Sequence, residues 1–534
     1  MSHRKRPGAV PENMQDVSEY YRYCPDQPKQ LISDSVCLGR RRSRYPHCAG
    51  CQFNDDERGP AVAARESQQR AAQKLNAIEE LFASHDIRAE YPDPLDEDVA
   101  WRIGHATASY YRSALRGLDR SDPVATTVIV GRDMRPSSAT LCEALAEGAR
   151  STGAGVIDVG MIDTPQLCFA INHLGSGGGV QVTGACDPIE LNGFFFAGRG
   201  GRPVGPDTGL VDICRIARNM VRHDTGQSGP LETLDLAGEY RSFLRSQLAA
   251  PRPLKVIVDA SNGMAARWVP LVLDDVESLE LICLNTEHDG RFAHPPDPLV
   301  EGNLRQLRGE VRNTGADLGV CFGGGASRLV LVDEQGDVVR PDILTALLAR
   351  QLLSRSPGAT VVYDLCSSRV VAEEIKAAGG APRRERVGSV FMKKALAESR
   401  GVFGGERSGH YYYEHTHYCA SGLLTLIEIL NALTRDHRPL SEQVRPLLRY
   451  AATGERRFEN TTAEATIRRL ADQYGDARVD FLDGVTVQYE DWWFNVRRGA
   501  GENLLLLSLE ASTPELLERR LSEVAGHLGT PMDS

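Results

Sequence analysis

Hydrophobic and polar positions follow one pattern in three stretches of the chain. Each stretch begins with a β-branched run, passes through an aspartate and a turn of small residues, and ends in a helix-like segment. The three stretches are VIVGRDMRPSS (128–138), KVIVDASNGMAA (255–266) and TVVYDLCSSRV (360–370). Their aspartates, Asp133, Asp259 and Asp364, are 126 and 105 residues apart. This interval predicts three similar α/β domains, because solenoid repeats recur every ~20–50 residues.

The C-terminal part of the chain has a different pattern. Apolar and polar residues alternate over 485–489, and a second strand is predicted over LLLLSLEA (504–511). A helix is predicted to begin where Thr513 precedes Pro514, because a capping hydroxyl before a proline is typical of helix starts. Its apolar face consists of Leu517, Leu521, Val524 and Leu528. These elements predict a small α+β domain with an antiparallel sheet.

We therefore expect an α/β chain with three similar α/β domains and a smaller C-terminal α+β domain. A helix is also predicted over 61–83, after a cysteine-rich N-terminal segment. The expected divisions are a cysteine-rich module over 1–60, three α/β domains over 61–230, 231–340 and 341–445, and the C-terminal domain over 446–534.

Composition narrows the classes of protein to which the chain can belong. Hydrophobic residues make up 41% and charged residues 25%, which is typical of a soluble globular protein. The net charge of −11 disfavours a general nucleic-acid binder. No apolar run approaches the ~20 residues that cross a bilayer, and no apolar stretch follows the basic N-terminus. We expect a cytoplasmic protein with neither a nucleic-acid nor a membrane partner.

A series of segments resembles the phosphohexomutase superfamily (phosphoglucomutase/phosphomannomutase), and the resemblance covers about residues 78–534. The segments are HDIRAEYPD (85–93), VIVGRDMRPSS (128–138), the stretches 156–205 and 316–336, GGERSGHYYY (404–413) and WFNVRRGAGENLLLLSLEA (493–511). The resemblance implies a four-domain enzyme that moves a phosphoryl group between the 1- and 6-positions of a hexose. It also implies a phosphoserine donor and a Mg²⁺ ion held by three aspartates, because phosphoryl transfer depends on positioning and charge stabilisation.

The residues at the reaction centre depart from the family pattern. The nucleophile loop T-A-S-H-N-P is represented by TGACDP (183–188), so Ala185 occupies the phosphoserine position and offers no oxygen. Thr183, Cys186 and Asp187 carry nucleophilic atoms, but each is one to two residues from the in-line position. In the acid/base segment K-T-G-H, Ser389 replaces the histidine, and Lys393 downstream fits a solvated helix charge. No catalytic residue of the family is therefore intact.

The metal loop D-G-D-A-D-R also lacks its carboxylates. Gly323, Gly325 and Ser327 stand where the resemblance implies the three aspartates. Magnesium prefers oxygen ligands in octahedral geometry, and carboxylates offset the cost of dehydrating it. We therefore expect no magnesium at this loop.

Two loops for ligand recognition are better preserved. Glu406, Ser408 and His410 match the sugar-recognition motif that the resemblance implies, and a turn whose polar residues satisfy one another is the alternative. In the phosphate loop R-P-S-N-T-E-P, Arg497 is kept and Arg498 adds a second cation, while two hydroxyl donors are lost. Phosphate binding or a plain surface hairpin both fit this loop. The loops predict a binding site for a hexose phosphate.

Four cysteines lie close together near the N-terminus. The spacing of Cys24, Cys37, Cys48 and Cys51 includes one C-x2-C pair, which is a common half of a structural zinc site. We expect zinc there, with an iron–sulfur cluster and no metal as the alternatives. The basic run over 40–44 suits a solvated surface or a contact with an acidic partner protein.

Nucleophile, metal ligands and proton shuttle are absent together, while the scaffold and the sugar loop persist. The sequence therefore predicts a phosphohexomutase-like pseudoenzyme of carbohydrate metabolism that binds a hexose phosphate or a protein partner without turnover. One alternative is an active mutase with a displaced nucleophile, which makes the enzyme assignment open. Another is an interaction protein that acts through the cysteine module.

Overall fold

The computed structural model describes residues 21–24, 27–42, 48, 51, 78–82, 86–114, 126–220, 228–288, 291–499 and 503–532. The chain forms two compact units, Met1–Glu80 and Leu81–Ser534. Most of the helix predicted over 61–83 lies outside the described residues, and residues 78–81 are helical. In the described part of the chain no helix combines the length and apolarity needed to cross a membrane.

The smaller unit contains a short hairpin and one helix. Strand β1 (Tyr21–Cys24) pairs antiparallel with β2 (Gln27–Ser33), and α1 (Asp34–Arg42) follows directly. Cys24 ends the first strand and Cys37 lies in the helix, so the hairpin and helix bring two of the four N-terminal cysteines into one small element.

The first sheet of the larger unit has six strands in the order β3-β7-β6-β4-β5-β8. Its strands are β3 (Ile87–Glu90), β4 (Val128–Arg132), β5 (Val156–Met161), β6 (Gly178–Val182), β7 (Leu191–Gly198) and β8 (Leu231–Thr233). Its helices are α3 (Glu97–Ala114), α4 (Pro136–Arg150), α5 (Thr164–Leu174) and α6 (Leu210–Asn219). The central strand β4 is parallel to β5 and β6, and β6 then turns back antiparallel into β7.

The second sheet has the order β10-β9-β11-β12-β13. Its strands are β9 (Leu254–Asp259), β10 (Leu279–Leu284), β11 (Leu318–Phe322), β12 (Leu329–Asp333) and β13 (Val338–Val339), with α7 (Ala237–Arg245), α8 (Ala265–Leu273) and α9 (Arg305–Thr314). The central strand β9 is parallel to both neighbours, and β11 turns back antiparallel into β12.

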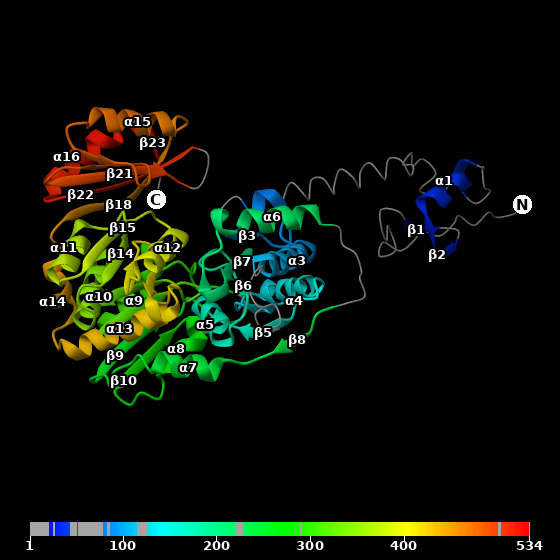
Figure 1. Cartoon of the computed structure of the whole chain (residues 1–534), viewed down its shortest axis with the longest axis horizontal. Coiled ribbons are helices and arrows are strands. Elements are labelled where there is room, and N and C mark those ends of the chain that lie inside the picture. Colours follow the sequence, from blue (N-terminus) through cyan, green and yellow to red (C-terminus); the bar gives the residue numbers. More distant parts are fainter. Residues whose placement is uncertain are drawn as a thin grey trace, which may run out of the picture. The chain divides into compact units, whose positions relative to one another are not determined.

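The third sheet repeats this arrangement in the order β15-β14-β16-β17. Its strands are β14 (Thr360–Asp364), β15 (Ala381–Glu385), β16 (Phe403–Gly405) and β17 (Tyr411–Tyr413). Its helices are α10 (Pro341–Arg355), α11 (Arg369–Ala377), α12 (Ser389–Ser399), α13 (Gly422–Arg435) and α14 (Leu440–Val444). Three sheets with the same central parallel strand and the same following hairpin confirm the prediction of three similar α/β domains (Figure 1). The boundaries at 230, 340 and 445 stay a prediction.

The fourth sheet is antiparallel and has the order β19-β20-β21-β22-β18-β23. Its elements are β18 (Ala451–Glu459), α15 (Ala463–Gln473), β19 (Arg478–Asp480), β20 (Val485–Gln488), β21 (Trp492–Arg498), β22 (Leu504–Ala511), α16 (Pro514–Ala525) and β23 (Thr530–Met532). Figure 1 shows α15 and α16 on one face of this sheet, and their apolar residues share one core with it. Thr513 caps α16 by accepting a hydrogen bond from the Leu516 backbone, as the sequence predicts.

The repeated aspartates Asp133, Asp259 and Asp364 follow or end the central strands β4, β9 and β14, and all three are buried. In each, one carboxylate oxygen accepts a hydrogen bond from the backbone amide two residues later, over 2.9–3.0 Å. Each aspartate therefore closes the turn between its strand and the following helix.

The second oxygen of each aspartate reaches a different loop. Asp133 accepts a hydrogen bond from the Gly184 backbone over 3.1 Å, and Asp364 accepts one from the Arg407 backbone over 2.6 Å. The corresponding partner of Asp259 is the His294 side chain, at 3.0 Å. The aspartates thus fix the loops at the carboxyl ends of the parallel strands, where α/β sheets usually carry their sites.

Candidate functional site

A cavity of about 480 Å³ lies where the loops of the three α/β domains meet. The first domain contributes Arg88, Thr183, Ala185, Cys186 and Asp187, and the second contributes Asp297, Ser327 and Arg328. The third domain contributes Ser389, Lys393, Glu406, Ser408, His410 and Cys419. Most positions that the sequence singles out therefore line one cleft, in the volume range of small-molecule sites.

Ala185 lies in the loop after β6 with a φ of 48°. That left-handed conformation is uncommon for alanine and costs about 1–2 kcal/mol. The Ala185 amide donates to Thr183 Oγ1 over 2.9 Å, which holds the residue in place. The loop thus keeps a strained turn that faces the cavity with a methyl group in place of a hydroxyl.

The buried side chain of Arg135 holds the loop that carries Ala185 in position. Its buried guanidinium donates hydrogen bonds to the carbonyls of Asp187 at 2.6 Å, Pro188 at 2.5 Å and Leu191 at 3.0 Å. Its Nε also lies 3.4 Å from the Asp133 carboxylate. The sequence did not single out Arg135, although its place two residues after the repeated aspartate is the signal that could have identified it.

The neighbours of Ala185 that carry nucleophilic atoms are not prepared for attack. Burial raises the pKa of the Cys186 thiol, which favours the less reactive protonated form. Burial also raises the pKa of Asp187, although Arg88 opposes this at a distance of 3.4 Å. Both residues line the cavity, so substitution of either one tests whether it acts as a displaced nucleophile.

The loop Gly323–Arg328 packs directly against the loop that carries Ala185. A Cβ atom on Gly323 would lie 2.6 Å from Cys186 Sγ, and one on Gly325 would lie 3.0 Å from Thr164 Oγ1. Cys186 and Thr164 therefore occupy the space into which side chains at these glycine positions would project. The described loop lacks carboxylates, and neighbouring side chains fill the space at two of the three positions, so the residues present do not fit a magnesium ion.

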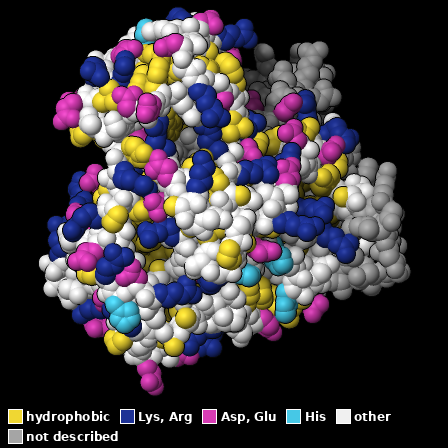
Figure 2. All heavy atoms as spheres, turned by 60° about the vertical axis from the view of Figure 1, so that its left-hand side comes forward, with side chains coloured by type: hydrophobic (Ala, Val, Ile, Leu, Met, Phe, Trp, Pro, Cys, Tyr) yellow, Lys and Arg dark blue, Asp and Glu magenta, His cyan; other side chains and the backbone are white. Residues whose placement is uncertain are grey.

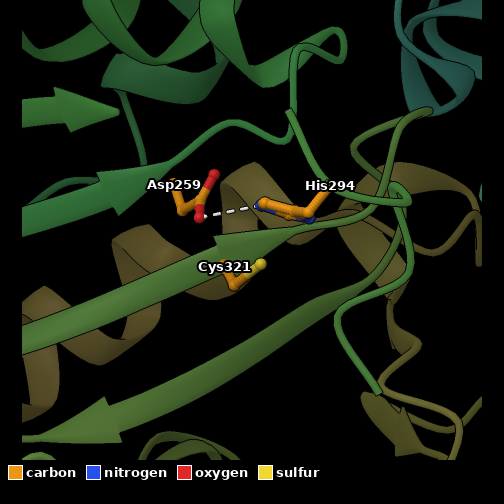
Figure 3. Close-up of side chains that lie close together, drawn as sticks. All are labelled: Asp259, His294 and Cys321. Atoms are coloured by element: carbon orange, nitrogen blue, oxygen red, sulfur yellow. Dashed lines mark hydrogen bonds and ion pairs between the residues drawn. The ribbon is translucent and has the colours of Figure 1, made fainter. Parts of the chain in front are cut away.

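A second group of potential metal ligands lies beside this loop. Asp259, His294 and Cys321 bring one ligand atom each to within 4.8 Å of one another (Figure 3). Figure 3 shows Asp259 and His294 pointing toward one another from different segments, with Cys321 on the adjacent strand. Asp259 and Cys321 are buried, and Nδ1 of His294 lies 2.9 Å from the Pro295 carbonyl.

This group fits an ion pair better than a metal site. The hydrogen bond to Asp259, aided by the carbonyl of Pro295, raises the pKa of His294 despite burial. Burial raises the pKa of Cys321 strongly, so its thiol stays protonated. The His294 imidazole, held between two oxygen acceptors, closes the loop of the second domain, as backbone amides do in the other two.

The sugar loop presents three polar side chains to the cavity. Ser408 Oγ lies 2.9 Å from His410 Nδ1, and Arg328 Nε donates to His410 Nε2 over 3.3 Å. Glu406 accepts hydrogen bonds from the Gly388 backbone at 2.7 Å and from the Tyr412 hydroxyl at 2.5 Å. The three residues hold one another in position and still line the cavity.

Burial dominates the electrostatics of this loop. It raises the pKa of Glu406 to about 7, with the nearby Asp364 acting in the same direction. It also lowers the pKa of His410 well below its usual value, and the positive charge of Arg328 adds to this effect. Neutral His410 therefore accepts at Nε2 and donates from Nδ1 to Ser408, which leaves the serine proton available for a ligand.

Lys393 corrects a sequence-based expectation. The side chain is 4% exposed, whereas the sequence suggested a solvated helix charge. Its ammonium lies 3.9 Å from Cys168 Sγ and 6.0 Å from the centre of the Phe195 ring. Among the described residues no carboxylate lies within ion-pair distance of it. The spacing i, i+3 to buried Leu396 on α12 is the signal that could have indicated burial.

Three cationic side chains line the cavity, and they differ in how closely carboxylates pair with them. Arg88 lies 2.9 Å from Asp86 and 3.4 Å from Asp187, and Arg328 lies 3.9 Å from Asp297. Lys393 is therefore the cavity cation with the least compensation from its described neighbours. Ser389, at the position of the missing histidine, begins α12 and lines the same wall.

The two arginines of the phosphate loop are not among the residues that line this cavity. Arg497, on β21, is 8% exposed and contacts Glu455 at 2.6 Å. Arg498 is half-exposed and lies 3.6 Å from Glu464. Both guanidinium groups are thus engaged by carboxylates of the fourth domain, and residues 500–502 of the loop lie outside the described residues.

The four N-terminal cysteines are all described and all reduced. The Cys51 amide donates to the Cys48 carbonyl over 3.1 Å, which is a tight turn across the C-x2-C pair. Burial raises the pKa of the Cys48 thiol, and the charges of Cys51, Cys37 and Cys24 add to this effect. The other three cysteines therefore lie near enough to Cys48 to influence its charge.

Family models match three consecutive parts of the larger unit. Residues 79–220, 238–336 and 340–450 match domains I, II and III of the phosphoglucomutase/phosphomannomutase α/β/α description. These ranges correspond to the three parallel-centred sheets.

Individual relatives extend over most of the chain. A phosphomannomutase of Escherichia coli (strain K12) is 30% identical over 442 residues, which cover 80% of this chain and 94% of the relative. Phosphohexose mutases of Xanthomonas campestris pv. campestris are 32% identical over 458 residues, covering 84% and 98%. A crystal structure of a phosphoglucomutase/phosphomannomutase family protein from Burkholderia thailandensis superimposes with a TM-score of 0.76 at 31% identity, covering 84% of this chain and 97% of that one.

Proposed function

This chain belongs to the phosphoglucomutase/phosphomannomutase family, and we propose that it binds a hexose phosphate in its central cleft without transferring the phosphoryl group. The observation that carries the proposal is the division of the cavity wall into two kinds of residue. The groups suited to ligand contact are present, whereas Ala185, Ser327 and Ser389 line the cavity where the family resemblance implies groups that transfer the phosphoryl group. Gly323 and Gly325, in the loop beside the cavity, replace two further carboxylates that the resemblance implies.

The sugar end of the proposed ligand is assigned to Glu406, Ser408 and His410. A carboxylate, a hydroxyl and a neutral imidazole held by mutual hydrogen bonds offer both donors and acceptors to sugar hydroxyls. Because their positions are fixed before the ligand arrives, little conformational entropy is lost on binding.

The phosphate end is assigned to Lys393, with Arg328 as a second cation. An ammonium group in a largely buried wall without a described carboxylate partner is costly unless an anion compensates it. A phosphate group would supply that compensation through charge-assisted hydrogen bonds. Arg497 and Arg498 would join only if phosphate replaced Glu455 and Glu464 as their partner.

Binding is tested by isothermal titration calorimetry with mannose 6-phosphate, glucose 6-phosphate and glucose 1-phosphate, with free glucose and inorganic phosphate for comparison. Lys393→Met should abolish measurable binding, whereas Lys394→Met on the exposed side of the same helix should not change it. If the heats of titration with the hexose phosphates equal those with free glucose, the proposed binding is wrong.

Turnover is tested separately, because the rival function is an active mutase with a displaced nucleophile. The assay converts mannose 1-phosphate to mannose 6-phosphate with a bisphosphate activator and Mg²⁺. We expect no product above background. Product formation that disappears in Asp187→Asn would establish the rival, since Asp187 is the carboxylate nearest in sequence to the phosphoserine position.

A separate proposal concerns the N-terminal unit. We propose that Cys24, Cys37, Cys48 and Cys51 hold a zinc ion, supported by the C-x2-C spacing and by the turn that joins Cys48 to Cys51. Metal analysis of the full chain should give about one zinc per chain, and Cys48→Ser should lose it while Cys142→Ser keeps it. Iron with sulfide, or no metal, would overturn the assignment. A protein partner at the basic run is a further proposal that a pull-down with and without zinc would test.

A further inference from the structure

The charged side chains that line the cleft are unevenly paired. On the wall of the first domain, the Arg88 guanidinium lies 2.9 Å from the Asp86 carboxylate and 3.4 Å from the Asp187 carboxylate. All three residues line the cavity of about 480 Å³. Two carboxylates thus flank one guanidinium, so this group has a net negative charge when both carboxylates are ionised.

Two other guanidinium groups near this wall already face carboxylates of their own. Arg135 lies behind the wall, with its Nε 3.4 Å from the Asp133 carboxylate, and it is not among the residues that line the cavity. Arg328 lines the cavity and lies 3.9 Å from Asp297, which lines it too. Both arginines are therefore partly compensated before a ligand arrives.

Lys393, on the wall of the third domain, is paired differently. Its side chain lines the cavity and is 4% exposed, and its ammonium contacts the Cys168 sulfur at 3.9 Å. Among the described residues no carboxylate lies within ion-pair distance of this ammonium. Arg497 and Arg498 are engaged by carboxylates of the fourth domain and are not among the residues that line the cavity. In the described cleft, Lys393 is therefore the cation best placed to compensate an anionic ligand.

We propose that Asp86 and Asp187 restrict this cleft to sugars that carry a single phosphate group. This restriction rests on the proposed binding of a hexose phosphate. A phosphate monoester carries a charge of about −1.5 to −2 at pH 7, and Lys393 together with Arg328 can compensate one such group. A second phosphate would find Arg88 already paired and would approach Asp86 and Asp187, and like charges that are brought together oppose binding.

The pairing of Arg88 can be removed with little change in shape, because asparagine differs from aspartate mainly in its charge. The Arg88 Nη1 also donates to the Ile87 carbonyl over 2.6 Å, which holds the guanidinium in place when the carboxylates are gone. In the double variant Asp86→Asn, Asp187→Asn, the guanidinium can then form a bidentate pair with phosphate. The two substitutions should therefore strengthen the binding of a sugar bisphosphate.

The test compares glucose 6-phosphate with glucose 1,6-bisphosphate by isothermal titration calorimetry on the full chain. We expect the unmodified chain to bind the monophosphate about tenfold more tightly, because like charges in a binding site cost free energy. The double variant should bind the bisphosphate about tenfold more tightly than the unmodified chain does, with little change for the monophosphate. Asp98→Asn is the matched control, since Asp98 pairs with Arg102 at 3.1 Å and is not among the residues that line the cavity. It should change neither affinity.

Two further measurements separate charge from size, because a bisphosphate is also larger than a monophosphate. High salt should reduce the preference of the unmodified chain for the monophosphate, since salt screens charges but does not alter shape. Arg88→Gln, added to the double variant, should remove the gain in affinity for the bisphosphate. A preference that is independent of salt would be one of size and would overturn the proposal, even if the double variant did not fold.

The outcomes for the two ligands distinguish this restriction from the proposed function. Equal or tighter binding of the bisphosphate by the unmodified chain would overturn the restriction alone. A folded double variant that gains no affinity for the bisphosphate, or gains as much for the monophosphate, would overturn it as well. If the chain binds neither sugar phosphate, the proposed function and the restriction are both wrong.

Discussion

Arg328 donates a hydrogen bond to His410 Nε2 over 3.3 Å and thereby joins the vacated metal loop to the sugar loop. The contact fixes the imidazole as a neutral acceptor at Nε2 and directs its Nδ1 proton to Ser408. In the proposed function, Arg328 of the glycine-rich loop thus orients a side chain that is assigned to the sugar. The proposed loss of phosphoryl transfer is therefore compatible with the proposed binding in the same cleft.

Ser408→Ala should weaken the binding of mannose 6-phosphate about fivefold, because one neutral hydrogen bond contributes about 1 kcal/mol. Ser399→Ala at the end of α12 is the matched control, since the Ser399 hydroxyl donates to the Ala395 carbonyl of its own helix. Calorimetric affinities of the two variants check the prediction. Equal affinities of the two variants for mannose 6-phosphate would mean that the polar residues of this turn satisfy only one another and do not contact the ligand.

Ala185→Ser should not restore turnover, although it returns a hydroxyl to the position of the family's nucleophile. No carboxylate lies in the loop Gly323–Arg328 to hold a cation, and Cys186 occupies the space beside Gly323. Phosphoryl transfer depends on charge stabilisation by a metal, so the hydroxyl alone is insufficient. The mannose 1-phosphate assay with Mg²⁺ checks this, and product from the single variant would show that a metal still binds.

Hexose phosphate affinity should rise between about pH 6 and 8, because the pKa of Glu406 is about 7 and the ionised carboxylate accepts stronger hydrogen bonds. The groups that face it are Asp364, Tyr412, Arg328 and His410. Glu406→Gln cannot ionise and should lose this step, keeping only the titration of the ligand's phosphate near pH 6. Calorimetric affinities of both proteins between pH 6 and 8 check this prediction. Parallel pH profiles of the two proteins would contradict a role for Glu406 ionisation.

Much of the fold is predictable because the repeated strand, aspartate and turn pattern is local. The strands ending near Asp133, Asp259 and Asp364 are confirmed, and so is the helix that Thr513 begins. Each depends on residues within a few positions along the chain. Burial of Lys393, in contrast, depends on packing against Phe195 of another domain, which no local pattern reveals.

The site was predictable in composition but not in its charge balance. Motif comparison finds the absent serine at Ala185 and the sugar-loop residue Glu406 without any structure. It does not reveal that the Lys393 ammonium lies 3.9 Å from the sulfur of Cys168, 225 positions away. Figure 2 shows basic and acidic side chains interspersed over one face of the molecule. The net charge of −11 therefore does not predict which charges line the cleft.

Arg135→Met should lower the free energy of unfolding by about 3–5 kcal/mol, because a buried cation is lost and its partners are left unsatisfied. The carbonyls of Asp187, Pro188 and Leu191 would lose their donor, and Asp133 would lose its counter-charge. Urea unfolding followed by circular dichroism measures the change.

The matched control for Arg135 is Arg241→Ala, whose partner Asp275 is exposed. That surface ion pair should contribute at most about 1 kcal/mol. Equal losses in the two variants would mean that Arg135 does not hold the loop.

His294→Gln should destabilise the chain at acidic and neutral pH more than at alkaline pH. The pKa of His294 is raised in the folded protein by its hydrogen bond to Asp259, so the folded state binds the proton more tightly than the unfolded chain does. The extra stability is fully present below the unfolded pKa of about 6.5 and is lost as pH rises through the folded value. A hydrogen bond between charged groups contributes about 1.5–3 kcal/mol, which sets the expected difference at pH 5.5. Urea unfolding of both proteins at pH 5.5 and pH 9 measures whether the destabilisation decreases as pH rises. If His294 bound a metal, the destabilisation would instead depend on added zinc and increase with pH.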